Sequence, residues 1–234
     1  MKILQWLAGL AFAFSLLIIV FITSFQVAMY SDFGWYERTY ERYNVQAHLD
    51  MEMDDIMYVT HEMMDYLVGE RDDLIVMTTI GGEERSFFGY QDRFHMYEVK
   101  VLFLAGLDVR NIATDVLLLA LLVIIITRAT YQKLIPKSLW IALGTMAAAS
   151  LALVVIFLVD FSHAFVVFHE IFFDNDLWLF DPTTSYMIRM LPEGLFYDMI
   201  MRVLGFFGLS IGALLLASIL FYKLGNRQLI TSSN

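Results

Sequence analysis

The amino-acid sequence predicts an all-α polytopic membrane protein, with four transmembrane helices and an extracellular, mainly helical cap that includes a small β-hairpin. Hydrophobic residues make up 59% of the 234-residue chain, whereas soluble domains are about half apolar. Four apolar runs approach or exceed the roughly 20 residues that cross a bilayer core as a helix. All 25 acidic residues lie in two segments, 32–115 and 160–198. This uneven charge is typical of a chain with one exposed acidic face.

The four apolar runs define the expected transmembrane helices. Lys2 precedes the first run, as in a signal peptide. Its apolar core is longer than the roughly 7–15 residues of such peptides, so we expect an uncleaved span. The second run is short by itself, and the polar residues before it extend it, with Asp115 near the interface. The expected spans are residues 3–27, 111–130, 138–160 and 199–222.

Lysine and arginine predict the orientation of these spans in the cell membrane. The short connector 128–137 and the C-terminal tail carry such residues and no acid. Positive residues in short loops stay on the cytoplasmic side. We therefore expect cytoplasmic N- and C-termini, with 28–110 and 161–198 outside. The net charge of −10 then describes an external face and gives no reason to expect a nucleic-acid partner.

Residues 28–110 are too long for a simple connection, and we expect them to form the cap. Apolar residues at helical spacing predict a helix over 54–67. Gly81-Gly82 lies between two runs that favour strands, which indicates a hairpin. A second cap helix is expected over 94–106, leading towards the second span.

The reactive residues include general bases but no recognisable protein nucleophile. The chain has no cysteine, which excludes disulfides, thiolate nucleophiles and Cys-ligated metals. Ser86, Ser162 and Ser185 are candidate nucleophiles by type only, because none lies in a nucleophile turn. His61-Glu62 begins a zinc motif in which Asp65 replaces the second histidine. A metal site assembled in the tertiary structure from His61, His95, His169 and an acid stays open.

His169 is the histidine with the most unusual surroundings. It lies between aromatic and apolar residues and is followed by Asp174, Asn175, Asp176 and Trp178. One interpretation is an interfacial aromatic belt with a solvated acidic face. The other is a catalytic imidazole, which carboxylates within reach can orient and tune towards neutral pH. The residues alone leave both interpretations open.

Two sequence elements resemble the bacterial lipoprotein intramolecular transacylase family. The first follows the third apolar run and comprises residues 169–173 (HEIFF), 175–178 (NDLW), 181–182 (DP) and 191–193 (LPE). The second is residues 93–100 (RFHMYEVK), which resemble the family's H-x-x-D-V-K element with Glu98 in place of the aspartate. The resemblance covers about residues 50–200 and includes the cap helix that ends at Asp65-Tyr66-Leu67.

The resemblance implies an acyltransferase of the outer membrane face that needs no cofactor or metal. Its substrate is a diacylated lipoprotein in the lipid bilayer. The sn-2 acyl chain moves from the glycerol oxygen to the α-amino group of the N-terminal cysteine, which forms a lyso-form lipoprotein. The resemblance assigns the two catalytic histidines to His95 and His169, one as a base and the other as an acid or oxyanion donor. Because the substrate brings its own amine nucleophile, no protein nucleophile is required.

Five further residues are candidates for supporting or substrate-binding roles. Asn175 is an oxyanion or headgroup donor, or else a turn-forming residue. Glu98 and Asp181 orient the histidines, or else form ordinary salt bridges in the cap. Trp178 is an interfacial anchor, and Tyr66 belongs to the cap helix that the resemblance covers. Two alternative functions remain: a metal-dependent membrane hydrolase, which chelation would inactivate, and a non-enzymatic transporter partner or sensor.

Overall fold

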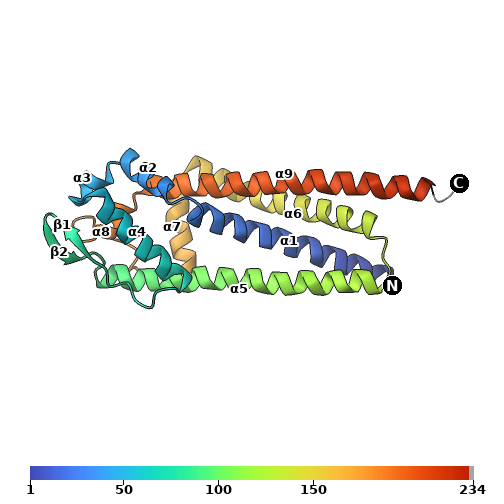
Figure 1. Ribbon diagram of the computed structural model, residues 1–234, viewed down its shortest axis with the longest axis horizontal. Helices are drawn as coiled ribbons and strands as arrows, with labels where there is room; N and C mark the ends of the chain where they lie inside the picture. Colours follow the sequence, from blue (N-terminus) through green and yellow to red (C-terminus); the bar gives the residue numbers. More distant parts are fainter. Residues whose placement is uncertain (232–234) are drawn as a thin grey trace. The chain divides into compact units, whose positions relative to one another are not determined.

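The structure is a computed structural model that describes residues 1–231, with the side chains of that range outside 149–154, 156–158 and 225–231. The described residues form helices and one two-stranded sheet (Figure 1). The helices are α1 (Lys2–Tyr30), α2 (Gly34–Arg42), α3 (Val45–Leu49), α4 (Met53–Val68), α5 (Tyr90–Ile126), α6 (Tyr131–Val159), α7 (Phe161–Phe172), α8 (Tyr186–Met190) and α9 (Glu193–Thr231). The strands are β1 (Met77–Ile80) and β2 (Glu83–Ser86).

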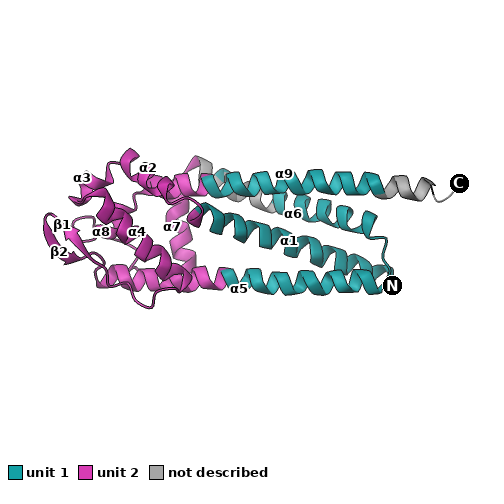
Figure 2. Ribbon diagram, in the orientation of Figure 1, with its two compact units in different colours: residues 1–28, 107–158, 202–234 teal, residues 29–106, 159–201 magenta. Residues whose placement is uncertain are grey.

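The chain divides into two compact units, which Figure 2 shows in different colours. Unit 1 contains residues 1–28, 107–158 and 202–234, and unit 2 contains residues 29–106 and 159–201. Two boundaries fall well inside α5 and α9, so each of these helices contributes to both units, and the other two fall at the last residues of α1 and α6.

Unit 1 contains most of the apolar length of the long helices. Among the described residues, α1, α5 and the Glu193–Leu224 part of α9 are long and apolar enough to cross a membrane. The apolar part of α5 follows its charged first turns, which lie in unit 2. The expected span 138–160 falls on α6, and many of its side chains lie outside the described residues. The described residues therefore include three helices that could cross a membrane, and α6 is a fourth long helix.

The helices of unit 1 pack closely around α1. Ala13 and Leu17 of α1 form a buried cluster with Leu139 and Ala142 of α6, against which side chains of α9 also pack. Gly9 of α1 lies so close to α6 that a Cβ atom there would be only 2.5 Å from the hydroxyl oxygen of Ser138. Small residues allow such close approach between membrane helices, where van der Waals packing and hydrogen bonds drive association.

Unit 2 contains the expected cap helix and two paired strands. The helix expected over 54–67 is α4. Strands β1 and β2 pair antiparallel on either side of Gly81 and Gly82, whose φ angles are +61° and +80°. Two successive positive φ angles are typical of the tight hairpin turn that matches strand twist, and glycine adopts them without steric cost.

Two segments differ from the sequence-based expectation. Helix α5 is uninterrupted, so the helix expected over 94–106 and the span expected over 111–130 form a single element. No proline lies between them to end the helix. Residues 161–198, expected to be an extracellular loop, contain α7, α8 and the start of α9. Asp160 starts α7 by accepting a hydrogen bond from the His163 backbone N–H, as an N-cap residue does.

Candidate active site

Unit 2 brings two buried histidines together from different helices. His95 lies in the second turn of α5, and His169 lies in the last turn of α7. Their ring centroids are 5.7 Å apart, and the ring planes make an angle of 27°. The exposed fractions are only 6% and 7%, respectively. Both residues were predicted from the sequence as a pair, and the structure places them side by side.

Aromatic rings cover both histidines. The Phe173 ring lies beside both of them, with its centroid 4.8 Å from that of His95 and 5.5 Å from that of His169. Trp178 stacks on His169 at 4.9 Å and an angle of 30°. The other rings in contact with the pair are Phe165, Phe168 and Phe180. Such a shell withholds water and thereby disfavours a charged imidazole.

A backbone hydrogen bond fixes the orientation of His169. Its Nδ1 lies 2.7 Å from the carbonyl oxygen of Phe165, one turn earlier on α7. Because a carbonyl oxygen can only accept, Nδ1 carries the proton and Nε2 has the lone pair in the neutral ring. Burial lowers the pKa of His169, while the bond to Phe165 opposes the shift. The ring is therefore neutral at neutral pH and offers Nε2 as a base.

His95 lies beside the carboxylate of Glu98, one turn later on α5. Its Nδ1 is 4.0 Å from Glu98 Oε2. This distance is too long for a hydrogen bond but close enough to favour a proton on Nδ1. Burial, and then the neighbouring His169, lower the pKa of His95 to about 4. Both rings of the pair are thus neutral. Nδ1 of His169 is hydrogen-bonded, whereas Nδ1 of His95 and Oε2 of Glu98 are buried without a hydrogen-bond partner among the described residues.

One face of α5 holds the segment that covers the histidines. Gln91, His95 and Glu98 have the spacing i, i+4, i+7, which places them on the same helix face. All three contact residues 173–180. Gln91 donates to the carbonyl oxygens of Leu177 and Leu179, each at 3.0 Å, and Glu98 accepts a hydrogen bond of 2.7 Å from the Asn175 amide. Sequence reasoning missed Gln91, although its position one turn before His95 was a signal.

A buried carboxylate ties the start of α5 to the start of α8. Asp92 is 3% exposed, and its two oxygens accept from the Gly89 N–H at 2.7 Å and the Ser185 hydroxyl at 2.6 Å. The first bond caps α5, and Ser185 is itself the N-cap of α8. Asp92 lies one turn before His95. It therefore fixes the helix that carries His95 to the start of α8.

Removing this carboxylate is expected to loosen the site. We expect Asp92→Asn to lower stability by about 1–3 kcal/mol, because a buried donor loses its acceptor. The rate of any reaction that depends on the histidine pair should fall, while the KM of its substrate changes less. Thermal unfolding and kinetics of the purified chain measure both, and Asp108→Asn, an exposed change on the same helix, is the matched control. Equal behaviour of the two variants would show that Asp92 does not position α5.

The other expected supporting residues have separate positions. Asn175 Oδ1 accepts from the Leu177 N–H, so this side chain forms a turn and also holds Glu98. Asp181 accepts hydrogen bonds from the N–H and the hydroxyl of Thr183. Of the two carboxylates expected to orient the histidines, only Glu98 lies beside one of them. Tyr66 is buried under Lys100, whose Nζ lies 4.1 Å from the ring centroid.

The candidate serine nucleophiles all have partners other than histidine. Ser86 donates to the Phe88 carbonyl, Ser162 to Glu193 and Ser185 to Asp92. His61 stacks on Phe33, with ring centroids 4.1 Å apart. Among the described residues, no three His, Asp or Glu side chains are grouped to hold a metal ion. The zinc set that includes His61 is therefore not assembled in the part of the chain that the structure describes.

An open pocket of about 490 Å³ adjoins the aromatic shell. Phe173, Asn175 and Trp178 belong both to this pocket and to the surroundings of the histidine pair. The remaining lining residues are Val166, Glu170, Asp174, Asp176 and Leu179. The lining therefore combines apolar side chains with acidic and amide groups.

Comparison with known proteins identifies similar chains. A sequence model of the family described as lipoprotein intramolecular transacylase Lit matches residues 10–196. A comparison with curated proteins found no match. Among solved structures, the chain is similar to the membrane integral lipoprotein intramolecular transacylase Lit from Bacillus cereus, with a TM-score of 0.74, 21% identity, and coverage of 100% of this chain and 99% of that chain.

Two variants of the Bacillus cereus protein give similar results. In one a histidine is replaced by alanine, with a TM-score of 0.68, and in the other by arginine, with a TM-score of 0.67. Both are 21% identical to this chain and cover 98% of it, and the chain covers 94% and 93% of theirs, respectively. The shared fold confirms the prediction of a mainly helical membrane protein.

Proposed function

This chain belongs to the lipoprotein intramolecular transacylase family, and from that premise we propose how its histidine pair moves an acyl chain within a lipoprotein. The substrate is a lipoprotein whose N-terminal cysteine carries a diacylglyceryl thioether. The α-amine attacks the sn-2 ester carbonyl, the new amide bond forms, and the bond to the glycerol oxygen breaks. The product is an N-acyl lyso-form lipoprotein.

The observation that carries the proposal is the pair of neutral imidazoles at 5.7 Å. The α-amino group has a pKa near 8 and is mostly protonated at neutral pH. Its nitrogen must lose two protons, one before the attack and one afterwards, and the leaving glycerol oxygen takes up one. Two neighbouring histidines that are neutral before the reaction can accept the two protons that the nitrogen loses. The histidine that has accepted a proton then serves as the acid for the leaving oxygen.

The two rings have defined places in this scheme. The Phe165 carbonyl holds His169 with Nε2 available to accept a proton. Glu98 lies beside Nδ1 of His95 and stabilises that ring once it is protonated. Gln91 and Asn175 hold the covering segment and Glu98 in position. We propose these three as positioning residues, and His95 and His169 as the catalytic residues.

The assay must distinguish isomers, because the acyl shift leaves the mass of the lipoprotein unchanged. We expect the N-terminal peptide from cells with this chain to lose reactivity towards amine-labelling reagents, and its fragment spectrum to show an N-acyl group and a monoacylglyceryl group. Cells without the chain keep a reactive amine on an intact diacylglyceryl cysteine. A labelled amine in both would contradict the proposed reaction. Loss of activity on chelation would instead favour the metal-dependent hydrolase.

We propose four membrane spans, with unit 2 on the extracellular side, on the basis of the charge bias described above. Because the chain lacks cysteine, a single introduced cysteine is the only site that a thiol reagent can label, and its labelling shows on which side of the membrane it lies. We expect Ser86→Cys and Thr184→Cys, both at exposed positions, to react with an impermeant thiol reagent in intact cells, and Lys223→Cys to react only after lysis. Ser185 is buried and therefore unsuitable. Labelling of position 223 alone in intact cells would contradict the orientation.

A further inference from the structure

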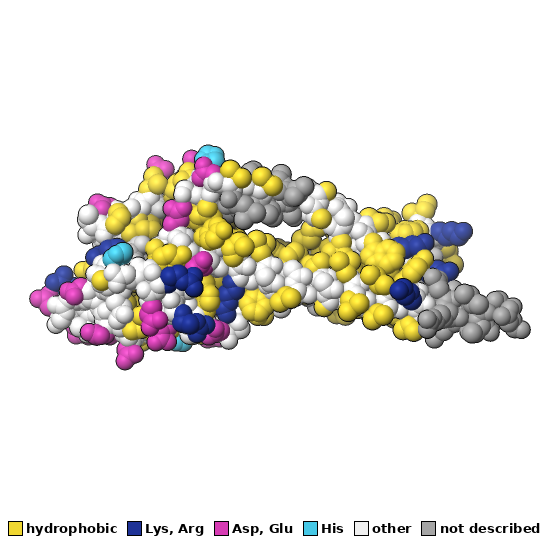
Figure 3. Space-filling model, turned by 90° about the horizontal axis from the view of Figure 1, so that it is seen from above, with side chains coloured by type: hydrophobic (Ala, Val, Ile, Leu, Met, Phe, Trp, Pro, Cys, Tyr) yellow, Lys and Arg dark blue, Asp and Glu magenta, His cyan; other side chains and the backbone are white. Residues whose placement is uncertain are grey.

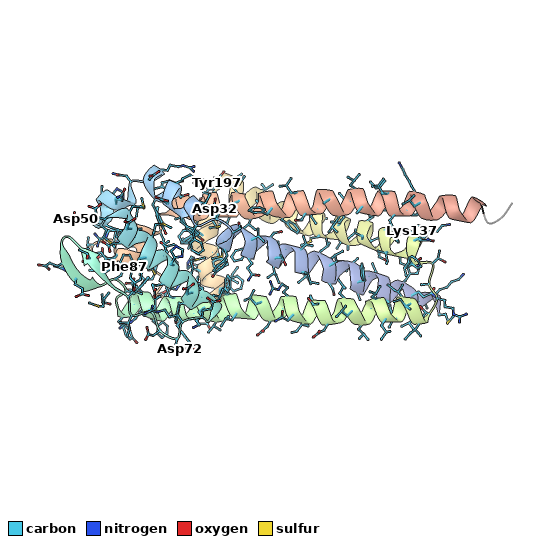
Figure 4. The ribbon with its side chains drawn as sticks, viewed as in Figure 1. Asp32, Asp50, Asp72, Phe87, Lys137 and Tyr197 are labelled. Atoms are coloured by element: carbon cyan, nitrogen blue, oxygen red, sulfur yellow. The ribbon has the colours of Figure 1, made fainter. Side chains whose placement is uncertain are left out.

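A second cavity lies in unit 1 and is lined by basic side chains. It has a volume of about 170 Å³ and lies between the start of α1, the α5–α6 connector and the start of α6. Lys2, Lys133 and Lys137 line it, together with Trp6 and Thr130. Figure 4 labels Lys137 near the start of α6. A single ordered water needs roughly 10–15 Å³ by such a measure, so there is room for a phosphate group.

The positive charge in this cavity has no acidic counterpart nearby. Helix α1, the connector and α6 contain no aspartate or glutamate. None of the ion pairs in the described part of the chain uses Lys2, Lys133 or Lys137. Figure 3 shows lysine and arginine side chains at this end of unit 1. Membrane orientation requires positive residues on one side, but it does not require three of them to line one cavity.

Backbone hydrogen bonds shape the connector beside the cavity. Arg128, two residues after the end of α5, has a positive φ of 51°, and the Ala129 N–H donates to the Ile124 carbonyl at 3.1 Å. Gln5 of α1 donates to the Thr127 carbonyl at 2.9 Å, which ties α1 to the end of α5. The cavity also includes the beginning of the 29-residue helix α6, where the helix dipole favours negative charge.

The surroundings favour a lipid over a soluble anion. Trp6 is 40% exposed, and tryptophan is typical of the membrane–water interface. On the same helix, Ile3, Leu4 and Leu7 are 78%, 51% and 60% exposed. An anion with acyl chains can place its phosphate between the lysines and its chains along this apolar surface. A free phosphate ion would use only the lysines.

We propose that this cavity binds the phosphate headgroup of an anionic phospholipid at the end of unit 1 expected to be cytoplasmic. This site is separate from the histidine pair, which belongs to unit 2. Each lysine near an anionic lipid surface strengthens binding about fivefold. Removing two of the three lysines should therefore weaken binding roughly 25-fold.

Native mass spectrometry of the full chain in detergent tests the proposal. The chain is titrated with phosphatidylglycerol, with phosphatidylcholine and with inorganic phosphate. We expect one phosphatidylglycerol to be retained where phosphatidylcholine and phosphate are not. Lys133→Gln with Lys137→Gln should lose it, whereas Lys133→Arg with Lys137→Arg should keep it. The matched control, Arg128→Gln with Lys223→Gln, removes the same charge outside the cavity lining and should weaken binding much less than the cavity variant.

Three results would overturn the proposal. Equal retention of phosphatidylcholine would remove the headgroup selectivity. Equal losses in the cavity variant and the control variant would indicate a general effect of charge. If phosphate alone bound as tightly as the lipid, the cavity would be a site for a free anion. The arginine variant controls for misfolding. It changes the same two positions but keeps their charge, so lipid binding by this variant together with loss of binding by the glutamine variant shows that the charge is required.

Discussion

Replacing His169 by alanine is expected to lower the rate of N-acyl lyso-lipoprotein formation by about 10²–10⁴-fold, the usual contribution of a general acid or base. The same loss is expected for His95→Ala. Each ring supplies one of the two neutral acceptors that the amine nitrogen requires. The measurement is conversion of a diacylglyceryl peptide by the purified chain, followed through labelling of the remaining amine. Protein level and membrane insertion should persist in both variants.

The double variant and the other histidines provide the controls. Because the two rings act as a unit, the double variant should be little slower than either single one. His48→Ala should be nearly silent, since this side chain is exposed and outside the cluster. His61→Ala and His163→Ala should be milder than the pair. If a folded His169→Ala chain converts substrate at a near wild-type rate, His169 is not catalytic. The aromatic residues around it would then act only as a membrane anchor.

The chemistry explains why two bases suffice without a protein nucleophile. Amine and ester belong to one substrate molecule, and holding two such groups together is worth effective molarities of about 10⁵ M or more, roughly 7 kcal/mol. The protein then has to move protons and exclude water. Rings around His95 and His169 exclude water. The Phe165 carbonyl accepts a hydrogen bond from Nδ1 of His169, and Glu98 lies 4.0 Å from Nδ1 of His95.

Much of the fold could be predicted because local sequence patterns determine where its helices and its hairpin turn lie. Apolar runs identified α1 and α9, helical spacing identified α4, and the Gly81-Gly82 pair marked the turn between β1 and β2. The bounds were less predictable. Nothing in the sequence separates the cap part of α5 from its membrane part, because a continuous helix needs no breaker at a membrane surface. The short helices α2 and α3 have too few turns to show a periodicity.

The site was only partly predictable, because its parts meet through tertiary contacts. His95 and His169 could be paired by resemblance to a family, but no spacing rule relates a residue of α5 to one of α7. The face formed by Gln91, His95 and Glu98 is visible in the sequence, yet the segment that it contacts is not. Asp92 could equally have been a solvent-exposed first-turn acid, and only the structure shows it buried against Ser185.

Acid is expected to destabilise the protein because His95 resists protonation in the folded state. Burial and the neighbouring His169 lower the pKa of His95 from 6.5 to about 4, and burial lowers the pKa of His169 as well. The unfolded chain therefore binds more protons than the folded chain between these two values. This stabilisation is fully present above about pH 6.5 and is lost as the pH falls towards 4. At about pH 5, His95 alone accounts for about 2 kcal/mol.

Thermal unfolding of the detergent-solubilised full chain measures this loss. For a chain of this size, 1 kcal/mol shifts Tm by about 2–4 °C. Between about pH 7.5 and pH 5, wild type should therefore lose about 4–8 °C more than His95→Asn, which has no ring to protonate. His48→Gln removes an exposed histidine and should lose as much as wild type. If His95→Asn lost stability in acid as steeply as wild type, His95 would not be held neutral, and the scheme of two neutral bases would lose its physical basis.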